Sequence, residues 1–443
     1  MEEIISIHIG QSGIQAGNAC WELFCLEHDI QLDGKLIQNS KIDDCKPIFF
    51  TETQSGQFIP RSVYFDLESN TINQVKTSAQ KQLFNPEFLV SDNQDKPKTF
   101  ARGYYQVSSQ YMELCLDKIR KLAENCSNLQ GFLIYNSAGG GTGSGYGSLL
   151  IEKIKETYHK KTNLGLTIFP SDQTQKEQIE PYNSVLCSQK MIEHGDVNLV
   201  LNNEALHDIC YKNYDIQNPT YIDLNRVIAQ GVSQLTCALR YDNYLQNHLS
   251  DFQMNLIPYP KFCFMLSSYS PQISPNTTIY TQYSTQEISD FLLKPQNMMA
   301  KCNPSSGKYM AVDIAYRGID IIPKSIGYVF QNWKVNKSFQ FTNWCKQIFK
   351  IQINYNLPSR IPESNFGFFY KSVFMISNST SISQVLQKIN NRFDQMFTKR
   401  EFTQLYQCEG MEENELIQAR EDLASLNSDY QDATETLEFE EEY

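Results

Sequence analysis

A run of glycines and hydroxyl side chains is the part of this sequence best suited to chemistry. Residues 139–145 read Gly-Gly-Gly-Thr-Gly-Ser-Gly. Because glycine lacks a Cβ atom, backbone N–H groups in such a run can approach a phosphate closely and curl around it. Thr142 and Ser144 add hydroxyl donors. The run predicts a phosphate-binding loop, and a flexible linker is the alternative.

Two apolar segments flank the loop and must hold it in place. Residues 131–135 predict a buried strand before it, and Leu149, Leu150, Ile151 and Ile154 recur at helical spacing after it. A helix that begins here directs the positive end of its dipole at the loop. Linkers rarely join a buried strand to an amphipathic helix, so the flanks favour the phosphate-binding interpretation.

The loop differs from two common nucleotide motifs. It lacks the Gly-Lys-Ser/Thr of a P-loop, and no acidic residue in a convincing context follows about 20 residues on, as the dinucleotide fingerprint requires. A dinucleotide enzyme stays open as an alternative, although no acid/base dyad accompanies the loop.

Strand and helix signals alternate through the first half of the chain. Short apolar runs at 4–9, 131–135, 164–169 and 197–201 predict buried strands. This alternation predicts an α/β fold with a doubly wound parallel sheet, whose ligands bind at the carboxyl ends of the strands.

The later part of the chain predicts a helix between two domains and a helical end. A long amphipathic helix follows Pro219, and mixed strands and loops come after it. We expect three regions: a nucleotide-binding domain at 1–203, a second α/β domain at 204–380, and a C-terminal helical region with an acidic tail at 381–443.

Composition restricts the class of protein. The net charge is −12, and residues 409–443 carry 13 acidic residues and one basic residue, so the preceding 408 residues are neutral overall. The acidic end repels nucleic acid and attracts basic partners, or serves only solubility. No run of eighteen apolar residues predicts a membrane span, and the N-terminus does not resemble a secretory signal, so we expect a cytosolic protein. The twelve cysteines form no C-x-x-C pair, which argues against a zinc site.

The string GGGTGSG resembles the signature loop of the tubulin family. Segments similar to α-type tubulin lie at 5–34, 101–105, 180–184, 203–210, 219–226, 251–260, 307–311 and 409–415. A long segment at 358–371 and the terminal Glu-Glu-Tyr also resemble the α type. The chain is therefore identified as a member of the tubulin family, of α type, from motifs that cover nearly its whole length.

The resemblance implies GTP and Mg²⁺ as cofactors. The positions that match GTP-binding residues are Gln11, Glu68, Asp95, Ser137, Gly140, Gly141, Thr142, Gly143, Glu180, Asn203, Tyr221 and Asn225. Glu68 matches a carboxylate near the metal, and one carboxylate beside a triphosphate suits Mg²⁺. Asn203 and Asn225 match guanine-reading positions, since an amide offers donors and an acceptor. Tyr221 is expected to stack on the base.

The resemblance further implies a heterodimer with β-tubulin that stacks head to tail into microtubules. Asp251 matches the position from which α chains present a catalytic carboxylate to the GTP of the adjacent β subunit, so the family implies a GTPase that acts across the interface. The family normally has glutamate there, and an acid where His248 stands, so we expect slower hydrolysis. The alternative is a divergent α-like structural subunit with an impaired catalytic contribution, used in specialised microtubules.

Other expectations concern departures from the family and the tail. Lys98 and Lys176 replace uncharged residues near the nucleotide, where each either pairs with phosphate or crowds the pocket, and the loop around Lys41 is shortened. Residues 428–443 are expected to form a disordered anionic tail that recruits microtubule-associated proteins and motors. The expected location is the cytoplasm, in the microtubule cytoskeleton, with cilia included.

Overall fold

The computed structural model describes residues 2–37, 48–92, 97–107, 109–171, 178–241, 248–275, 283–319, 321–345, 348–362 and 364–434. Its strands are β1 (Glu3–Ile9), β2 (Phe50–Glu52), β3 (Phe58–Pro60), β4 (Ser62–Asp66), β5 (Leu89–Ser91), β6 (Leu129–Ser137), β7 (Thr162–Phe169), β8 (Val197–Asn202), β9 (Phe264–Ser270), β10 (Tyr309–Gly318), β11 (Ile348–Asn354) and β12 (Lys371–Ser379). Its helices are α1 (Gly10–Glu27), α2 (Ser69–Thr77), α3 (Phe100–Tyr105), α4 (Ser109–Glu124), α5 (Gly147–Thr157), α6 (Glu180–His194), α7 (Asn203–Lys212), α8 (Tyr221–Arg240), α9 (Leu249–Leu256), α11 (Thr285–Phe291), α12 (Pro323–Val335), α13 (Ser383–Phe397), α14 (Thr403–Cys408) and α15 (Glu413–Asp432). Asp95, Lys176 and Lys41 lie outside the described residues, as does the tail from 435 to 443.

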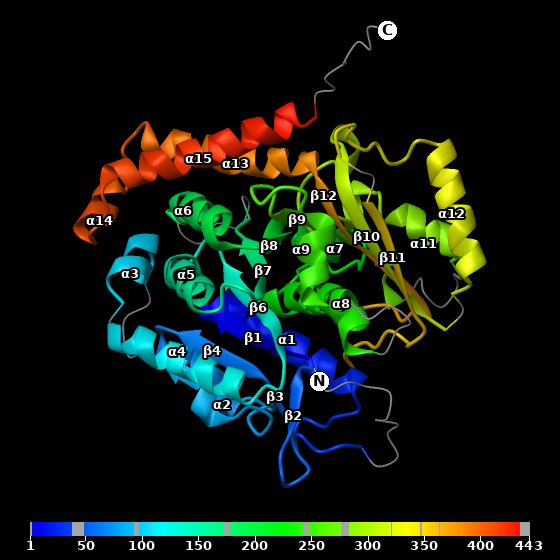
Figure 1. The fold of residues 1–443 in the computed structure, drawn as a ribbon, viewed down its shortest axis with the longest axis horizontal. Coiled ribbons are helices and arrows are strands. Elements are labelled where there is room, and N and C mark those ends of the chain that lie inside the picture. Colours follow the sequence, from blue (N-terminus) through cyan, green and yellow to red (C-terminus); the bar gives the residue numbers. More distant parts are fainter. Residues whose placement is uncertain are drawn as a thin grey trace, which may run out of the picture.

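One ten-stranded sheet runs through the molecule in the order β11-β10-β12-β9-β8-β7-β6-β1-β4-β5 (Figure 1). The strands from β5 to β9 pair in parallel, whereas β12 runs antiparallel to both β9 and β10. Every residue of β1 is buried, as expected for a parallel strand that is covered on both faces. The predicted doubly wound α/β fold is confirmed.

Helices cover both faces of the sheet. The core on one face joins residues of α1, α2, α7, α8 and α9, and the cores on the other face join residues of α4, α5, α6, α12, α13 and α15. Successive residues of β8 alternate between them, with Leu199 and Leu201 on one side and Val200 on the other. In Figure 1, α13 and α15 lie side by side above α6. No helix in the described ranges is long and apolar enough to cross a membrane.

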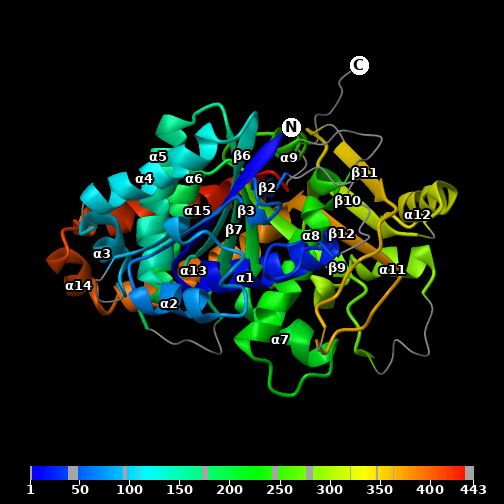
Figure 2. The same ribbon diagram turned by 90° about the horizontal axis from the view of Figure 1, so that it is seen from below.

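Helix α8 connects the two halves of the sheet, as the sequence predicted for the helix after Pro219. It packs against α1 on one side and against β10, β11 and β12 on the other, and Figure 2 shows α1 and α8 together near the middle of the molecule. A capping box of Thr220 and Asp223 starts the helix. The domain boundaries at 203/204 and 380/381 stay predictions.

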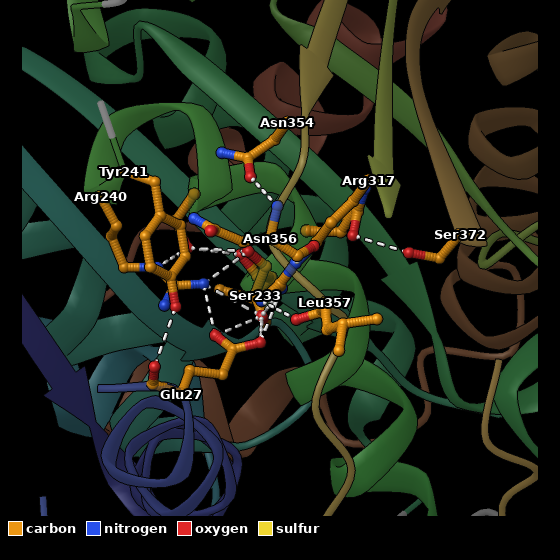
Figure 3. A network of polar contacts seen from close by, with 12 residues as sticks. Glu27, Ser233, Arg240, Tyr241, Arg317, Asn354, Asn356, Leu357 and Ser372 are labelled. Atoms are coloured by element: carbon orange, nitrogen blue, oxygen red, sulfur yellow. Dashed lines mark hydrogen bonds and ion pairs between the residues drawn. The ribbon is translucent and has the colours of Figure 1, made fainter. Parts of the chain in front are cut away.

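A buried ionic network fastens α8 to its neighbours (Figure 3). The Glu27 carboxylate at the end of α1 contacts Arg240 Nη2 at 2.6 Å and Arg317 Nη1 at 2.6 Å. Ser233 Oγ donates to the same carboxylate at 2.7 Å. Burial opposes ionisation, but the two guanidinium groups outweigh it and lower the pKa of Glu27 to about 2. The network therefore joins α1, α8 and β10 by charge as well as by packing.

The structure corrects the predicted start of the disordered tail. Residues 428–432 belong to α15, which ends at Asp432. Tyr430 holds this last turn in place, because its ring is fully buried and lies 4.7 Å from that of Phe262. The prediction of disorder was wrong for these residues, because it was based on their negative charge and did not consider that Tyr430 could be buried against the core.

Candidate functional site

A cavity of about 630 Å³ lies where β1, β4 and β6 end. This size falls within the usual range for small-molecule sites, and the carboxyl edge of a parallel sheet is their usual place. The predicted GTP-binding residues that line it are Gln11, Glu68, Ser137, Gly140, Gly141, Thr142, Gly143, Glu180, Asn203, Tyr221 and Asn225. Asp95 lies outside the described residues. The structure thus gathers these side chains into one cavity, while their individual roles stay predictions.

Two glycines of the loop serve different physical purposes. A Cβ atom added to Gly140 would meet nothing within 4 Å, so this part of the backbone faces open space in the cavity. A Cβ atom on Gly141 would lie 2.5 Å from the carbonyl oxygen of Pro97, which is closer than real atoms pack. Gly140 thus leaves room for a ligand, and Gly141 lets the loop pack against the segment behind it.

The loop passes directly into a helical turn that begins at Thr142. Residues Thr142–Tyr146 form a π-helical turn, which continues into α5 at Gly147. Wide turns of this kind occur frequently at functional sites. Thr142 lines the cavity.

Ser144 differs from its predicted use. Its hydroxyl donates to the carbonyl oxygen of Gly140 at 2.7 Å, and the residue is fully buried. The hydroxyl therefore shapes the loop, instead of adding a donor for phosphate as the composition of the run suggested.

Two carboxylates stand together at the end of β4. Asp66 and Glu68 both line the cavity, and the backbone N–H of Glu68 donates to Asp66 Oδ1 at 3.2 Å. Asn70 Nδ2 donates to Glu68 Oε1 at 2.8 Å, which orients the carboxylate. Sequence reasoning singled out Glu68 and missed Asp66, although the signal was the alternation in Asp66-Leu67-Glu68, which places both side chains on one face of an extended segment.

The other end of the cavity is built by two helix starts. Asn203 is the first residue of α7, while Tyr221 and Asn225 lie one turn apart on α8. Glu22 and Arg226 also line this end, and neither was predicted from the sequence. Burial raises the pKa of the Glu22 carboxyl, and the charge of Arg226 opposes the rise.

Lys98 does not line the cavity, whereas its neighbour Pro97 does. Asn183 Nδ2 donates to the carbonyl oxygen of Lys98 at 2.9 Å, and the lysine is exposed. The backbone of Lys98 is thus fixed beside the glycine loop.

Asp251 lies near the amino-terminal end of β6, whereas the cavity lies at the carboxyl end of that strand. It is in the first turn of α9, where its Oδ2 accepts from the backbone N–H of His248 at 3.1 Å. The backbone N–H of Leu249 donates to Gln130 Oε1 at 3.0 Å, near the start of β6. The glycine loop follows the other end of β6, after Ser137. At about 3.3 Å per residue, Gln130 and Ser137 are roughly 23 Å apart along the strand. Asp251 therefore cannot reach a ligand in the cavity of its own chain.

Charged neighbours surround Asp251. Lys350 Nζ on β11 lies 3.6 Å from Asp251 Oδ2, and both side chains are partly exposed. His248 Nδ1 lies 2.8 Å from Glu2 Oε2. Sequence reasoning missed Lys350, because only the pairing of distant strands brings it beside α9.

Comparison with protein-family models gives two matches. Residues 3–211 match the GTPase domain of the Tubulin/FtsZ family, and residues 260–391 match the Tubulin C-terminal domain. The chain belongs to the tubulin family. It therefore has the GTPase domain of this family. Members of the family are cytoskeletal, bind GTP and partner with other tubulin subunits. The first match includes β1, β4, β6 and the glycine loop, whereas Tyr221 and Asn225, which also line the cavity, come after its end at residue 211.

Proposed function

We propose that this chain is an α-type tubulin subunit. In this role it binds GTP with Mg²⁺, forms a heterodimer with β-tubulin and stacks head to tail into microtubules in the cytoplasm. Family membership supports the GTPase fold, and the segment at 358–371 with the terminal Glu-Glu-Tyr supports the α type.

The residues of the cavity fit a magnesium–nucleotide complex. Asp66 and Glu68 offer carboxylate oxygens to the cavity, and Gly140 leaves open space in it. Mg²⁺ prefers one or two carboxylates together with phosphate oxygens and waters. When bound, the ion would neutralise phosphate charge. Asn203 and Asn225 would offer amide groups to guanine, and Tyr221 a ring to stack on it.

One observation carries the proposal of a shared catalytic site: the cavity and Asp251 lie at opposite ends of β6. A carboxylate held roughly 23 Å from its own nucleotide cannot act there. Head-to-tail stacking brings one end of a subunit against the opposite end of the next, and such a heterologous contact generates open filaments. In this arrangement Asp251 would orient the attacking water at the GTP of the adjacent β subunit, and this chain's own GTP would persist.

A second candidate is an α-like structural subunit whose catalytic contribution is slow. The ion pair with Lys350 favours it, because the ammonium group competes with the attacking water for the Asp251 carboxylate. Aspartate is also one methylene shorter than the usual glutamate, and a displacement on the order of 1 Å can cost about 100-fold in rate.

Phosphate release per polymerised dimer tests the proposal. Copolymers of Asp251→Ala with β-tubulin should lose assembly-linked hydrolysis, and Asp251→Glu should accelerate it if the second candidate is right. Glu415→Ala is a matched control, because Glu415 also closes a capping box at the third position of its helix. Phosphate release at the unmodified rate from Asp251→Ala copolymers would refute the catalytic role. Regular filaments from the pure chain with GTP would refute the α-type assignment.

A further inference from the structure

A buried carboxyl lies beneath the ion pair of Asp251 and Lys350. Asp313 on β10 is only 3% exposed, and it is the register partner of Lys350 on β11. Side chains of register partners point to the same face of a sheet. Helix α9, which carries Asp251, packs against both strands. The three residues therefore form one group, with Lys350 next to a carboxylate at the surface and a carboxyl in the interior.

The hydrogen bonds of Asp313 leave it incompletely satisfied. Gln352 Nε2 donates to Asp313 Oδ2 at 2.7 Å. Asp313 Oδ1 is buried and has no hydrogen-bond partner within the described part of the chain. A protonated carboxyl tolerates this setting far better than a carboxylate, because burying an incompletely paired charge is costly.

The charges that face Asp313 come from two elements. Lys350 on β11 favours its ionised form, and Asp251 on α9 disfavours it. On β12 the register partner is the apolar Ile376, and on α8 the nearby Gln234 is neutral and donates to the carbonyl oxygen of Ala315. His248 lies beyond Asp251 and is itself paired with Glu2.

Burial dominates this balance. It raises the pKa of Asp313 to about 7, against the charge of Lys350 and the hydrogen bond from Gln352, while Asp251 adds to the rise. Both forms of the carboxyl are therefore populated near neutral pH. Only the ionised form of Asp313 attracts the ammonium group of Lys350, and it then competes with Asp251 for that group.

We propose that Asp313 is a positioning residue that controls, through Lys350, whether the Asp251 carboxylate is paired or released. When Asp313 is neutral, Lys350 stays with Asp251. When Asp313 is ionised, it draws the Lys350 ammonium inward and leaves Asp251 free to face the neighbouring subunit. The consequence for GTP hydrolysis rests on the proposed function of Asp251, whereas the coupling between the three side chains does not.

The first experiment measures hydrolysis by copolymers with β-tubulin between about pH 6 and about pH 8. The unmodified chain should show a rise on the order of tenfold with a midpoint near 7, as Asp313 loses its proton. Asp313→Asn should remove the rise and hold the rate at the low-pH level. Lys350→Gln should also flatten the profile, but at the high-pH level. A purely structural role predicts the same inflection in all three proteins, and that result would overturn the proposal.

The second experiment needs no hydrolysis. Infrared difference spectra of the full chain in its dimer should show a carboxylic acid band that titrates near 7 and is absent from Asp313→Asn. Asp251→Asn should move this transition to lower pH, and Lys350→Gln should move it to higher pH. If neither variant moves the transition, the coupling is wrong.

The two proposals fail in different ways. If Asp251→Ala copolymers hydrolyse GTP normally while the infrared transition still responds to Asp251→Asn, the catalytic role falls and the coupling stands. If Asp251→Ala abolishes hydrolysis but Asp313→Asn keeps the inflection, the catalytic role stands and the positioning role of Asp313 falls.

Discussion

Arg317 on β10 and Glu27 on α1 form a fully buried ion pair, with 2.6 Å between Arg317 Nη1 and Glu27 Oε1. The two residues belong to different matched regions of the chain, and Arg240 on the central helix contacts the same carboxylate. One glutamate thus compensates two buried arginines. Such an arrangement makes the helix between the two halves sensitive to the loss of a single negative charge.

Glu27→Gln should destabilise the chain strongly. Removing one partner of a buried pair typically costs about 3–5 kcal/mol, because the remaining charge is left uncompensated. The folded pKa of Glu27 is lowered to about 2 from an ordinary 4.5, so its stabilisation is present above about pH 4.5 and is lost as pH falls through about 2. Urea unfolding of Glu27→Gln and of the exposed control Glu287→Gln checks this. Equal unfolding midpoints for the two variants would contradict the expectation.

Asp313→Asn should change stability with the opposite pH dependence. The folded pKa of Asp313 is raised from 3.8 to about 7, so the stability that it contributes is present below about pH 4 and is lost as pH rises through about 7. Asparagine at this position does not titrate. The free energy of unfolding of Asp313→Asn should therefore increase relative to that of the unmodified chain across this pH range, by up to about 4 kcal/mol. Free energies of unfolding measured at about pH 5.5 and about pH 8 test this. A constant difference between the two proteins would exclude the raised pKa.

Alanine at the two amides of the cavity should weaken guanine-nucleotide retention. If Asn203 and Asn225 read guanine, each substitution leaves polar groups of the base unpaired, which costs about 1–3 kcal/mol, or roughly 5- to 150-fold in affinity. Chromatography of the nucleotide released by denaturation gives both its identity and its occupancy. Asn332→Ala, at an exposed position of α12, is the control. Adenine nucleotides in the unmodified protein would refute the guanine assignment.

Removing residues 435–443, which lie beyond the described residues, should weaken basic partners most at low salt. The deletion takes away five glutamates, and screening over about 10 Å at 0.1 M already reduces their attraction at higher ionic strength. Cosedimentation of a basic microtubule-binding protein with polymers of either form, across a salt series, measures this. Replacing the same glutamates with glutamine should reproduce the deletion. An equal loss at all salt concentrations would point to a contact that does not depend on charge.

The sequence by itself determined the parallel sheet, and its resemblance to the tubulin family pointed to 11 of the 29 residues that line the cavity. The apolar runs that became β1, β6, β7 and β8 carry their own signal, since a strand buried on both faces needs nearly continuous apolar residues. The carboxyl ends of parallel strands meet at one edge, so segments such as the glycine loop converge there once the strand order is set.

Only the tertiary structure decided which charges meet. Asp313 and Lys350 come together through strand pairing, Asp251 joins them because α9 packs on the same face, and Arg317 reaches Glu27 across α8. Tyr430 likewise extends α15 into a segment whose composition favoured disorder. Periodicity and composition report a residue's neighbours along the chain, whereas the pKa of a buried acid depends on groups far away in sequence, and only packing brings those within a few ångströms.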